Sequence, residues 1–213
     1  MFYFFLIFFV YDILVYSTSL SEHMTHLRSK CKFAYNEVEY LRHVIIGDGA
    51  HTDPKKIVAM QQWPTLTDIK SLRGFLGLTG YYKKFVKGYG QISAPLTALL
   101  KNDSFSWFEK AELAFQQLKA AMVQPLVLAL PNFDKPFVIE CDASGKGLGI
   151  ILMQQGKPIA FHSQALKGKN LALSTYEKEL LALVTAVKRW RAYLVGRPFI
   201  VGTDQQSLRY LLE

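Results

Sequence analysis

The sequence predicts an α/β fold in which a mixed β-sheet with covering helices is preceded by a helical region. In the C-terminal half, short β-rich runs bounded by turn residues come before a long segment of helical periodicity and one more apolar strand. In the middle of the chain, apolar residues recur at helical spacing after prolines placed where helices begin. A last strand reached through a helix indicates a crossover, so the sheet mixes antiparallel hairpins with a crossover connection.

The helical region extends from Asp53 to Leu100. Pro54 stands at a first-turn position, and Thr67 or Asp68 is a candidate N-cap of the next helix. Pro95 opens another short helix. A further helical pattern covers residues 105–122, and its apolar spacing assigns Trp107 and Phe115 to the core.

The β-rich half follows after two prolines. Its expected elements are strands at 137–141, 149–154 and 158–163, a tight turn at Gln155-Gly156-Lys157, a helix at 174–194 and a strand at 199–203. Asp142 follows the first of these strands, Asp204 follows the last, and Glu179 lies in the first turns of the helix. Magnesium prefers hard oxygen ligands, and phosphodiester cleavage needs a metal-activated water and a stabilised leaving oxygen. For either Asp taken alone, a turn or N-cap role remains an equal alternative.

The helix phase bears on Glu179. At about 100° per residue, one apolar stripe contains Tyr176, Leu180, Leu183, Val187, Trp190 and Leu194. Glu179 falls at the edge of this stripe, whereas Glu177 lies farther round and reads as a solvated charge. We expect Asp142, Glu179 and Asp204 to converge closely enough for one magnesium ion to bridge them.

Several segments occur in an order typical of one family: Phe-Asp-Lys-Pro-Phe at 133–137, Asp-Ala-Ser-Gly at 142–145, Tyr-Glu-Lys-Glu-Leu-Leu-Ala at 176–182 and Thr-Asp-Gln-Gln-Ser-Leu at 203–208. On these residues the chain resembles the RNase H domain of gypsy-type LTR retrotransposon Pol polyproteins. Upstream, Trp63-Pro64 and the run from Leu72 to Tyr82 resemble the end of the palm and the thumb of the adjoining reverse transcriptase.

The resemblance implies a palm remnant at 1–46, a thumb or connection at 47–106 and an RNase H-like domain at 107–213. It also implies that Asp142, Glu179 and Asp204 are catalytic ligands of Mg²⁺, with Mn²⁺ as a substitute. The family places a fourth acid later in the domain, so we expect the domain to be truncated at its C-terminus and its cleavage of RNA–DNA hybrids to be impaired. Other parts of the Pol polyprotein are expected partners.

The segment Phe9-Val10-Tyr11-Asp12 resembles the palm hairpin that carries the polymerase's paired aspartates. Tyr11 replaces the first of that pair, and a phenol with a pKa near 10 is a poor substitute for a carboxylate at neutral pH. Asp12 is therefore interpreted as a vestige of the polymerase site, and polymerisation is expected to be absent. The family also usually has Gly where Arg42 stands, which puts the tight backbone packing of its primer grip in doubt.

The formal charge of +8 over 213 residues favours a polyanionic partner, here an RNA–DNA hybrid or a duplex. The candidate phosphate contacts are Arg73, Lys83, Lys84 and Lys87, interleaved with aromatic residues; a solvated basic face is the alternative for each. Two cysteines fit a reducing compartment, and the apolar residues 1–11 lack a basic segment and a cleavage site. We expect an intracellular protein of the cytoplasm or nucleus that is not secreted and does not insert into a membrane.

Two further interpretations of the whole chain stay open. One is a noncatalytic nucleic-acid-binding module that kept its basic surface after both active sites decayed. The other is an unstable pseudogene product, since a lost internal palm segment and a lost strand would expose sheet edges and apolar faces.

Overall fold

The computed structural model describes residues 19–30, 36–101, 105–123 and 127–203. The chain divides into two compact units, residues 1–38 and 39–213. In the first unit the described element is helix α1, Leu20–Lys30. Tyr11 and Asp12 lie outside the described residues.

A small antiparallel sheet begins the second part of the chain, with strands in the order β1 (Glu37–Tyr40), β2 (His43–Ile46) and β3 (Gly49–Thr52). Leu41 and Arg42 form the turn between β1 and β2, with φ of 46° and 61°. These are left-handed backbone conformations, which favour glycine. A glycine at position 42, which the resembled family usually has, would adopt this conformation without strain.

The helical layer follows this sheet. Its elements are α2 (Pro54–Gln61), α3 (Ile69–Tyr81), the 3₁₀ turn η1 (Lys83–Phe85), α4 (Tyr89–Ile92), α5 (Ala94–Leu99) and α6 (Glu109–Val123). Three of its starts confirm the sequence-based predictions, since Pro54 begins α2, Asp68 caps α3 and Pro95 lies in the first turn of α5. The Asp68 carboxylate accepts from the Ser71 N–H at 2.8 Å, and the Ser71 hydroxyl returns a bond to the cap.

Helix α6 packs into the core of this helical layer. Phe115 is buried and its ring lies 4.7 Å from that of Phe75 on α3. Lys119 donates to the Trp63 carbonyl at 2.6 Å and lies over the Phe115 ring. Trp107 is partly buried against the same core, so both residues expected in a core are found there.

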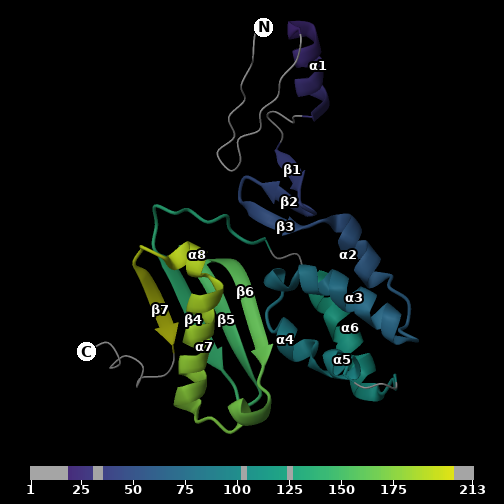
Figure 1. The fold of residues 1–213 in the computed structure, drawn as a ribbon, viewed down its shortest axis with the longest axis vertical. Helices are drawn as coiled ribbons and strands as arrows, with labels where there is room; N and C mark the ends of the chain where they lie inside the picture. Colours follow the sequence, from purple (N-terminus) through teal and green to yellow (C-terminus); the bar gives the residue numbers. More distant parts are fainter. Residues whose placement is uncertain (1–18, 31–35, 102–104, 124–126, 204–213) are drawn as a thin grey trace. The chain divides into compact units, whose positions relative to one another are not determined.

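The second core lies in a four-stranded sheet with strand order β6-β5-β4-β7 (Figure 1). Its strands are β4 (Phe137–Ala143), β5 (Gly147–Gln154), β6 (Lys157–Ala165) and β7 (Phe199–Thr203). Strands β4, β5 and β6 are antiparallel neighbours, and β7 pairs with β4 in parallel. Gln155 and Gly156 turn between β5 and β6 with positive φ, as the expected tight turn requires.

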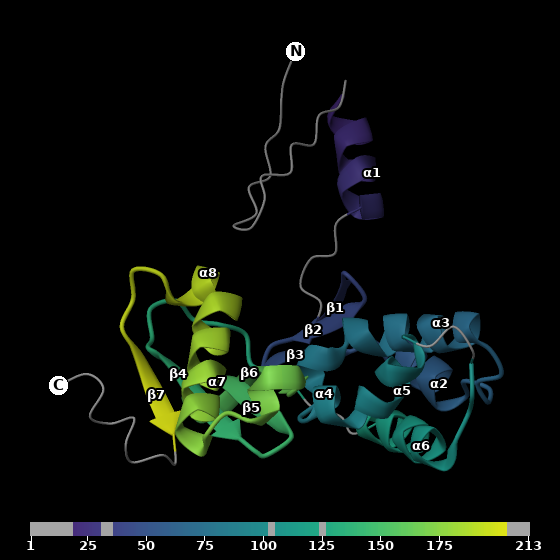
Figure 2. The ribbon, with the colours of Figure 1, turned by 60° about the horizontal axis from the view of Figure 1, so that its bottom comes forward.

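One face of this sheet is covered by α7, Thr175–Arg189 (Figure 2). The short 3₁₀ segment η2, Gly168–Leu171, leads into it. The expected helix at 174–194 is broken at Trp190, which separates α7 from α8, Arg191–Leu194. Ser174 and Glu177 form the capping box of α7. The Glu177 side chain is exposed, as predicted.

The helical layer meets the sheet along β6, where α4 packs against the strand. The Gly90 N–H donates to the Ser163 hydroxyl at 2.6 Å, and the Gln91 side-chain amide donates to the Leu148 carbonyl at 3.2 Å. A Cβ atom on Gly90 would lie 2.5 Å from the Ser163 carbonyl oxygen, so this close approach requires glycine. Within the ranges given above, no helix has the length and apolar character needed to cross a membrane.

Candidate active site

Strands β4 and β7 end together at one edge of the sheet. They run in parallel, and Cys141 lies opposite Thr203 in the register. Asp142 is the next residue of β4, and Asp204 is the next residue of the sequence after Thr203. The expectation that the two strands are neighbours is confirmed, whereas Asp204 itself lies outside the described residues.

Side chains alternate along β4, so Asp142 and Cys141 point to opposite faces of the sheet. Cys141 is buried beneath α7, whereas Asp142 and Glu140 are exposed on the other face. Glycines oppose both acids, because Gly149 pairs with Asp142 and Gly202 pairs with Glu140. The absence of side chains at these glycines leaves the sheet surface open beside the carboxylates.

A hollow of about 460 Å³ lies on this open face. Its lining residues are Lys87, Gly88, Glu140, Cys141, Asp142, Gly149, Ile150, Ile151, Phe161, His162, Gly202 and Thr203. Lys87 and Gly88 come from the segment between η1 and α4, and the others come from the sheet. The carboxylate hollow, as we call it, thus combines two exposed acids with a lysine contributed from outside the sheet.

Glu179 reaches the same strand from the other face. It is only 6% exposed, and it lies in line with Ala182 and Ala186, which are fully buried. The prediction that Glu179 stands at the edge of the buried stripe is therefore wrong, since it lies at the centre of the face that meets the sheet. The two small alanines allow this close approach, whereas larger residues such as Leu180 and Leu183 flank it and are only partly buried.

The Glu179 carboxylate is held against the end of β4. Its Oε1 accepts a hydrogen bond from the Ala143 N–H at 2.9 Å, so it contacts the residue next to Asp142. Burial, and then the negative charge of Glu179, raise the pKa of Cys141 to about 12. This thiol stays protonated at neutral pH, which excludes it as a thiolate nucleophile or metal ligand there.

The donor set suits magnesium in its chemistry. Asp142 offers an exposed carboxylate and Glu179 a second one from an adjoining element, and carboxylate oxygens are the ligands that magnesium prefers. Among the described residues, no three His, Cys, Asp or Glu side chains form a group that could hold a metal ion. The convergence of all three predicted carboxylates stays a prediction, since it depends on Asp204.

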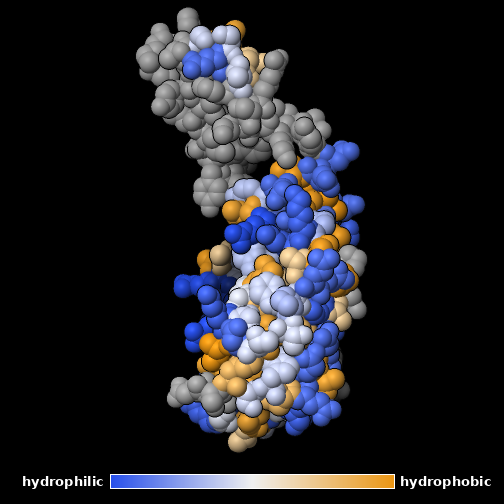
Figure 3. Space-filling view, turned by 90° about the vertical axis from the view of Figure 1, so that its right-hand side faces the viewer, coloured by the Kyte–Doolittle hydropathy of each residue, from blue (hydrophilic) through white to orange (hydrophobic). Residues whose placement is uncertain are grey.

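The four predicted phosphate contacts have different surroundings. Lys87 lines the carboxylate hollow, and Lys83 lines a second hollow beside β6. Lys84 lies over the Phe85 ring at 5.2 Å, and burial lowers its pKa. Arg73 is exposed on α3. Figure 3 shows hydrophilic and hydrophobic residues interleaved on one face of the molecule.

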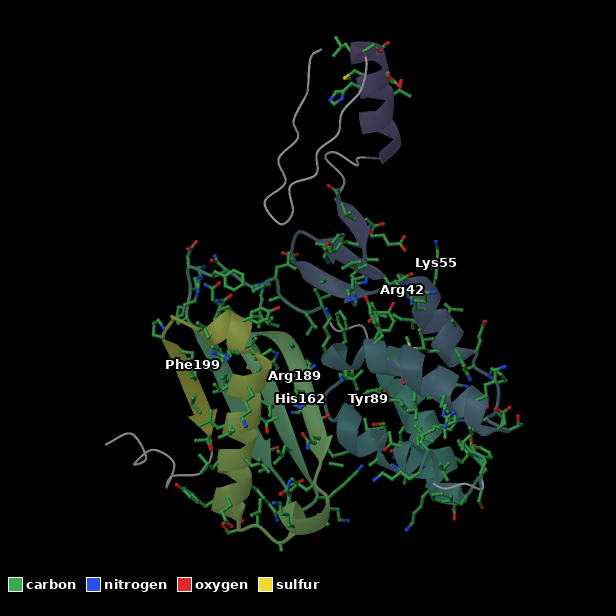
Figure 4. All side chains as sticks on the ribbon, in the orientation of Figure 1. Arg42, Lys55, Tyr89, His162, Arg189 and Phe199 are labelled. Atoms are coloured by element: carbon green, nitrogen blue, oxygen red, sulfur yellow. The ribbon has the colours of Figure 1, made fainter. Side chains whose placement is uncertain are left out.

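His162 is a site residue that sequence reasoning missed. Burial, and then the positive charges of Arg189 and Lys83, lower its pKa to about 4, so it is neutral at pH 7. Figure 4 labels His162 on β6 and Arg189 at the end of α7, and the two labelled residues lie near each other in this view. Glu140 was missed as well, although its position two residues before Asp142 places both on one face of a strand.

Comparison with known proteins shows which proteins this chain is similar to. Residues 107–201 match a family described as the RNase H-like domain found in reverse transcriptase. The chain is 41% identical to the Retrovirus-related Pol polyprotein from transposon 297 of Drosophila melanogaster over 217 aligned residues, covering 94% of this chain and 20% of the relative. It is 32% identical to the corresponding polyprotein from transposon gypsy of the same organism, covering 95% of this chain and 22% of the relative.

A shorter relative is matched over most of its length. An uncharacterized mitochondrial protein of Arabidopsis thaliana is 52% identical over 113 residues, covering 52% of this chain and 72% of that protein. The chain is therefore similar to retrotransposon Pol polyproteins, and its residues 107–201 match the RNase H-like domain found in reverse transcriptase. It spans about a fifth of the length of the two Drosophila relatives.

Solved structures share the fold. The foamy viral protease-reverse transcriptase in complex with double-stranded DNA superposes with a TM-score of 0.79 at 22% identity, covering 92% of this chain and 46% of that one. The same foamy viral protein in complex with an RNA/DNA hybrid gives a TM-score of 0.77 at 22% identity, covering 91% of this chain and 30% of that one.

Proposed function

We propose that this chain is part of a gypsy-type retrotransposon Pol protein that binds RNA–DNA hybrids and cleaves their RNA strand with magnesium. The observation that carries the proposal is the common end of β4 and β7, where Asp142 is exposed and Glu179 is bonded to the next residue of the strand. The foamy viral relatives were solved with a hybrid and with duplex DNA, which supports a nucleic-acid partner here.

Different residues have different roles in the proposed site. Asp142, Glu179 and Asp204 would hold the metal, which when bound supplies an activated water and a stabilised leaving oxygen. The Ala143 N–H fixes the orientation of the Glu179 carboxylate, since a charge-assisted hydrogen bond restrains it. Lys87 brings positive charge to the carboxylate hollow, where a backbone phosphate is attracted despite the two acids.

We propose that this chain does not polymerise DNA, because Tyr11 occupies the place of a metal-binding aspartate in the resembled motif. We also propose that cleavage depends on the full set of acids that the family resemblance implies, of which Asp142, Glu179 and Asp204 lie in this chain. A metal site depends on a complete and fixed ligand shell.

The test combines hybrid binding with cleavage. We expect salt-sensitive binding of a fluorescent RNA–DNA hybrid and slow magnesium-dependent nicking of its RNA strand. Asp142→Asn should abolish the nicking while binding stays nearly unchanged. Asp134→Asn is the matched control, because Asp134 is also exposed but lies before β4, and it should leave both properties intact.

Manganese provides a measurement that does not depend on the rate of cleavage. Mn²⁺ bound at the site should broaden the amide NMR signals of Ala143 and Gly202, and Asp142→Asn should remove the broadening. Cleavage that survives Asp142→Asn, or broadening that the substitution leaves unchanged, would place the metal site elsewhere. A protein that binds no hybrid would contradict the proposed partner.

A further inference from the structure

A second hollow, of about 330 Å³, lies where the helical layer meets the edge of the sheet. Its lining residues are Lys83, Tyr89, Gly90, Ser93, Thr97, Phe161, His162, Ser163, Gln164, Ala165, Lys167 and Asn170. They come from η1, α4 and α5 on one side and from β6 and the start of η2 on the other. We call this the junction hollow, and its walls are joined by the bond from the Gly90 N–H to Ser163.

The charges of the junction hollow have one sign. Lys83 and Lys167 stand on its two sides, and none of the described residues that line it is an Asp or a Glu. Both lysines are exposed, so their ammonium groups can meet a ligand without first leaving an ion pair with a lining carboxylate. Two lysines facing a polar hollow from different elements favour an anionic ligand with several oxygens, as a phosphate has.

Neutral donors complete this environment. The Ser163 hydroxyl accepts from the Gly90 N–H, which leaves its own proton free to be donated. The Asn170 side chain adds amide donors. His162 is neutral at pH 7, because its pKa is lowered by burial and then by the charges of Arg189 and Lys83, and a neutral imidazole still donates one N–H.

The volume of the junction hollow and its lining residues indicate which class of ligand it can bind. A volume of about 330 Å³ exceeds the space that one phosphate needs and lies at the low end of ligand pockets, roughly 300–1,000 Å³. Tyr89 and Phe161 provide apolar surface for a sugar. Phe161 and His162 also line the carboxylate hollow, so the two hollows adjoin.

We propose that the junction hollow binds one backbone phosphate and its sugar from a nucleic-acid strand and thereby positions that strand beside Asp142. This inference rests on the proposed function for its partner, and it adds a specific seat that involves Lys83, Lys167 and Ser163. Free inorganic phosphate has the same chemistry, and the experiment separates it from a strand phosphate.

The experiment measures the affinity of a fluorescent RNA–DNA hybrid by anisotropy over a series of salt concentrations. Lys83→Gln and Lys167→Gln should each weaken binding by about three- to tenfold and reduce the slope of log affinity against log salt by about 1. Gln164→Glu, which adds a carboxylate at the rim, should weaken binding as well. Lys110→Gln is the matched control, because Lys110 is exposed on α6 and lines neither hollow.

A second arm uses inorganic phosphate and the unmodified protein. Phosphate should shift the amide NMR signals of Ser163, Gln164 and Asn170, and the hybrid should shift the same signals at far lower concentration. If phosphate shifts them and the hybrid does not, the hollow takes a free anion and the strand assignment is wrong. If Lys110→Gln weakens hybrid binding as much as Lys83→Gln, only net charge matters and no specific seat exists.

The experiments distinguish a failure of this inference from a failure of the proposed function. Hybrid binding that is intact in Lys83→Gln and Lys167→Gln overturns the junction hollow alone, and the cleavage site at Asp142 is unaffected. Absence of hybrid binding by the unmodified protein contradicts the proposed function first. Circular dichroism of each variant verifies that the fold is retained.

Discussion

The Glu179 carboxylate accepts a hydrogen bond from the Ala143 N–H at 2.9 Å, which ties the N-terminal part of α7 to the end of β4. Glu179 is one of the few charged side chains buried among the described residues. A buried carboxylate is costly unless its oxygens are hydrogen-bonded, so this bond offsets part of the cost of burying Glu179 against the end of β4. The same contact gives Glu179 a part in stability as well as in the proposed chemistry.

Substitutions at Glu179 should separate these two parts. Glu179→Gln keeps an acceptor of the same size, so we expect the free energy of unfolding to change by less than about 1.5 kcal/mol. Glu179→Ala removes the acceptor and leaves a cavity, and we expect a loss of about 2–4 kcal/mol in urea denaturation. Both variants should lack hybrid cleavage. Equal stability losses in the two variants would contradict the role of the Ala143 bond.

Arg42→Gly should stabilise the protein. Arg42 has φ of 61° in the turn between β1 and β2, and glycine adopts this conformation without the steric cost of a Cβ. We expect a gain of about 1 kcal/mol, visible as a higher thermal midpoint. The bond from the Tyr82 hydroxyl to the Arg42 carbonyl involves only the backbone of residue 42 and should persist. Arg42→Ala is the control, since it removes the charge but keeps the strain.

Gly90→Ala should loosen the junction between α4 and β6. The added methyl would lie 2.5 Å from the Ser163 carbonyl oxygen, and backbone atoms on both sides must move to relieve the clash. We expect a loss of about 1–3 kcal/mol in thermal or urea unfolding. Gly77→Ala is the matched control, because no atom lies within 4 Å of a Cβ there and Gly77 is inside helix α3. That control should be neutral or stabilising by up to about 1 kcal/mol.

The stability of the protein should fall between pH 6.5 and pH 4 in part because of His43. Its ring stacks on Tyr81 at 5.3 Å, and burial, followed by the charge of Lys84, lowers its pKa from 6.5 to about 4. In this interval the unfolded chain binds a proton that the folded protein does not, so stability decreases as the pH falls. His43→Phe keeps an aromatic ring and should flatten the dependence of the thermal midpoint on pH.

His162 is a second group that should contribute to this dependence of stability on pH. Its pKa is lowered to about 4 as well, so the double variant His43→Phe, His162→Gln should show a flatter profile than either single one. A profile between pH 6.5 and pH 4 that is unchanged in both single variants would assign the pH dependence to other groups.

Local chemistry along the sequence determined most of the element starts and turns. Asp68 and Ser71 form a cap from residues three positions apart, and the turn at Gln155 and Gly156 needs only two neighbouring residues in left-handed conformations. The order of strands and helix also predicted that the strand of Asp142 and the strand before Asp204 are neighbours, because a helical crossover joins strands of one sheet. The family resemblance could also be detected from the sequence, because its motifs are short and continuous.

Tertiary packing decided which side chains share a site. Apolar periodicity placed Glu179 at the edge of a stripe, but helix and sheet approach most closely along small residues, so Ala182 and Ala186 set the buried line and include Glu179 in it. The junction hollow joins Lys83 to Lys167, which are far apart in the sequence, only because Gly90 lets α4 contact β6. Such distances depend on how two surfaces fit together, and no pattern within either segment encodes that fit.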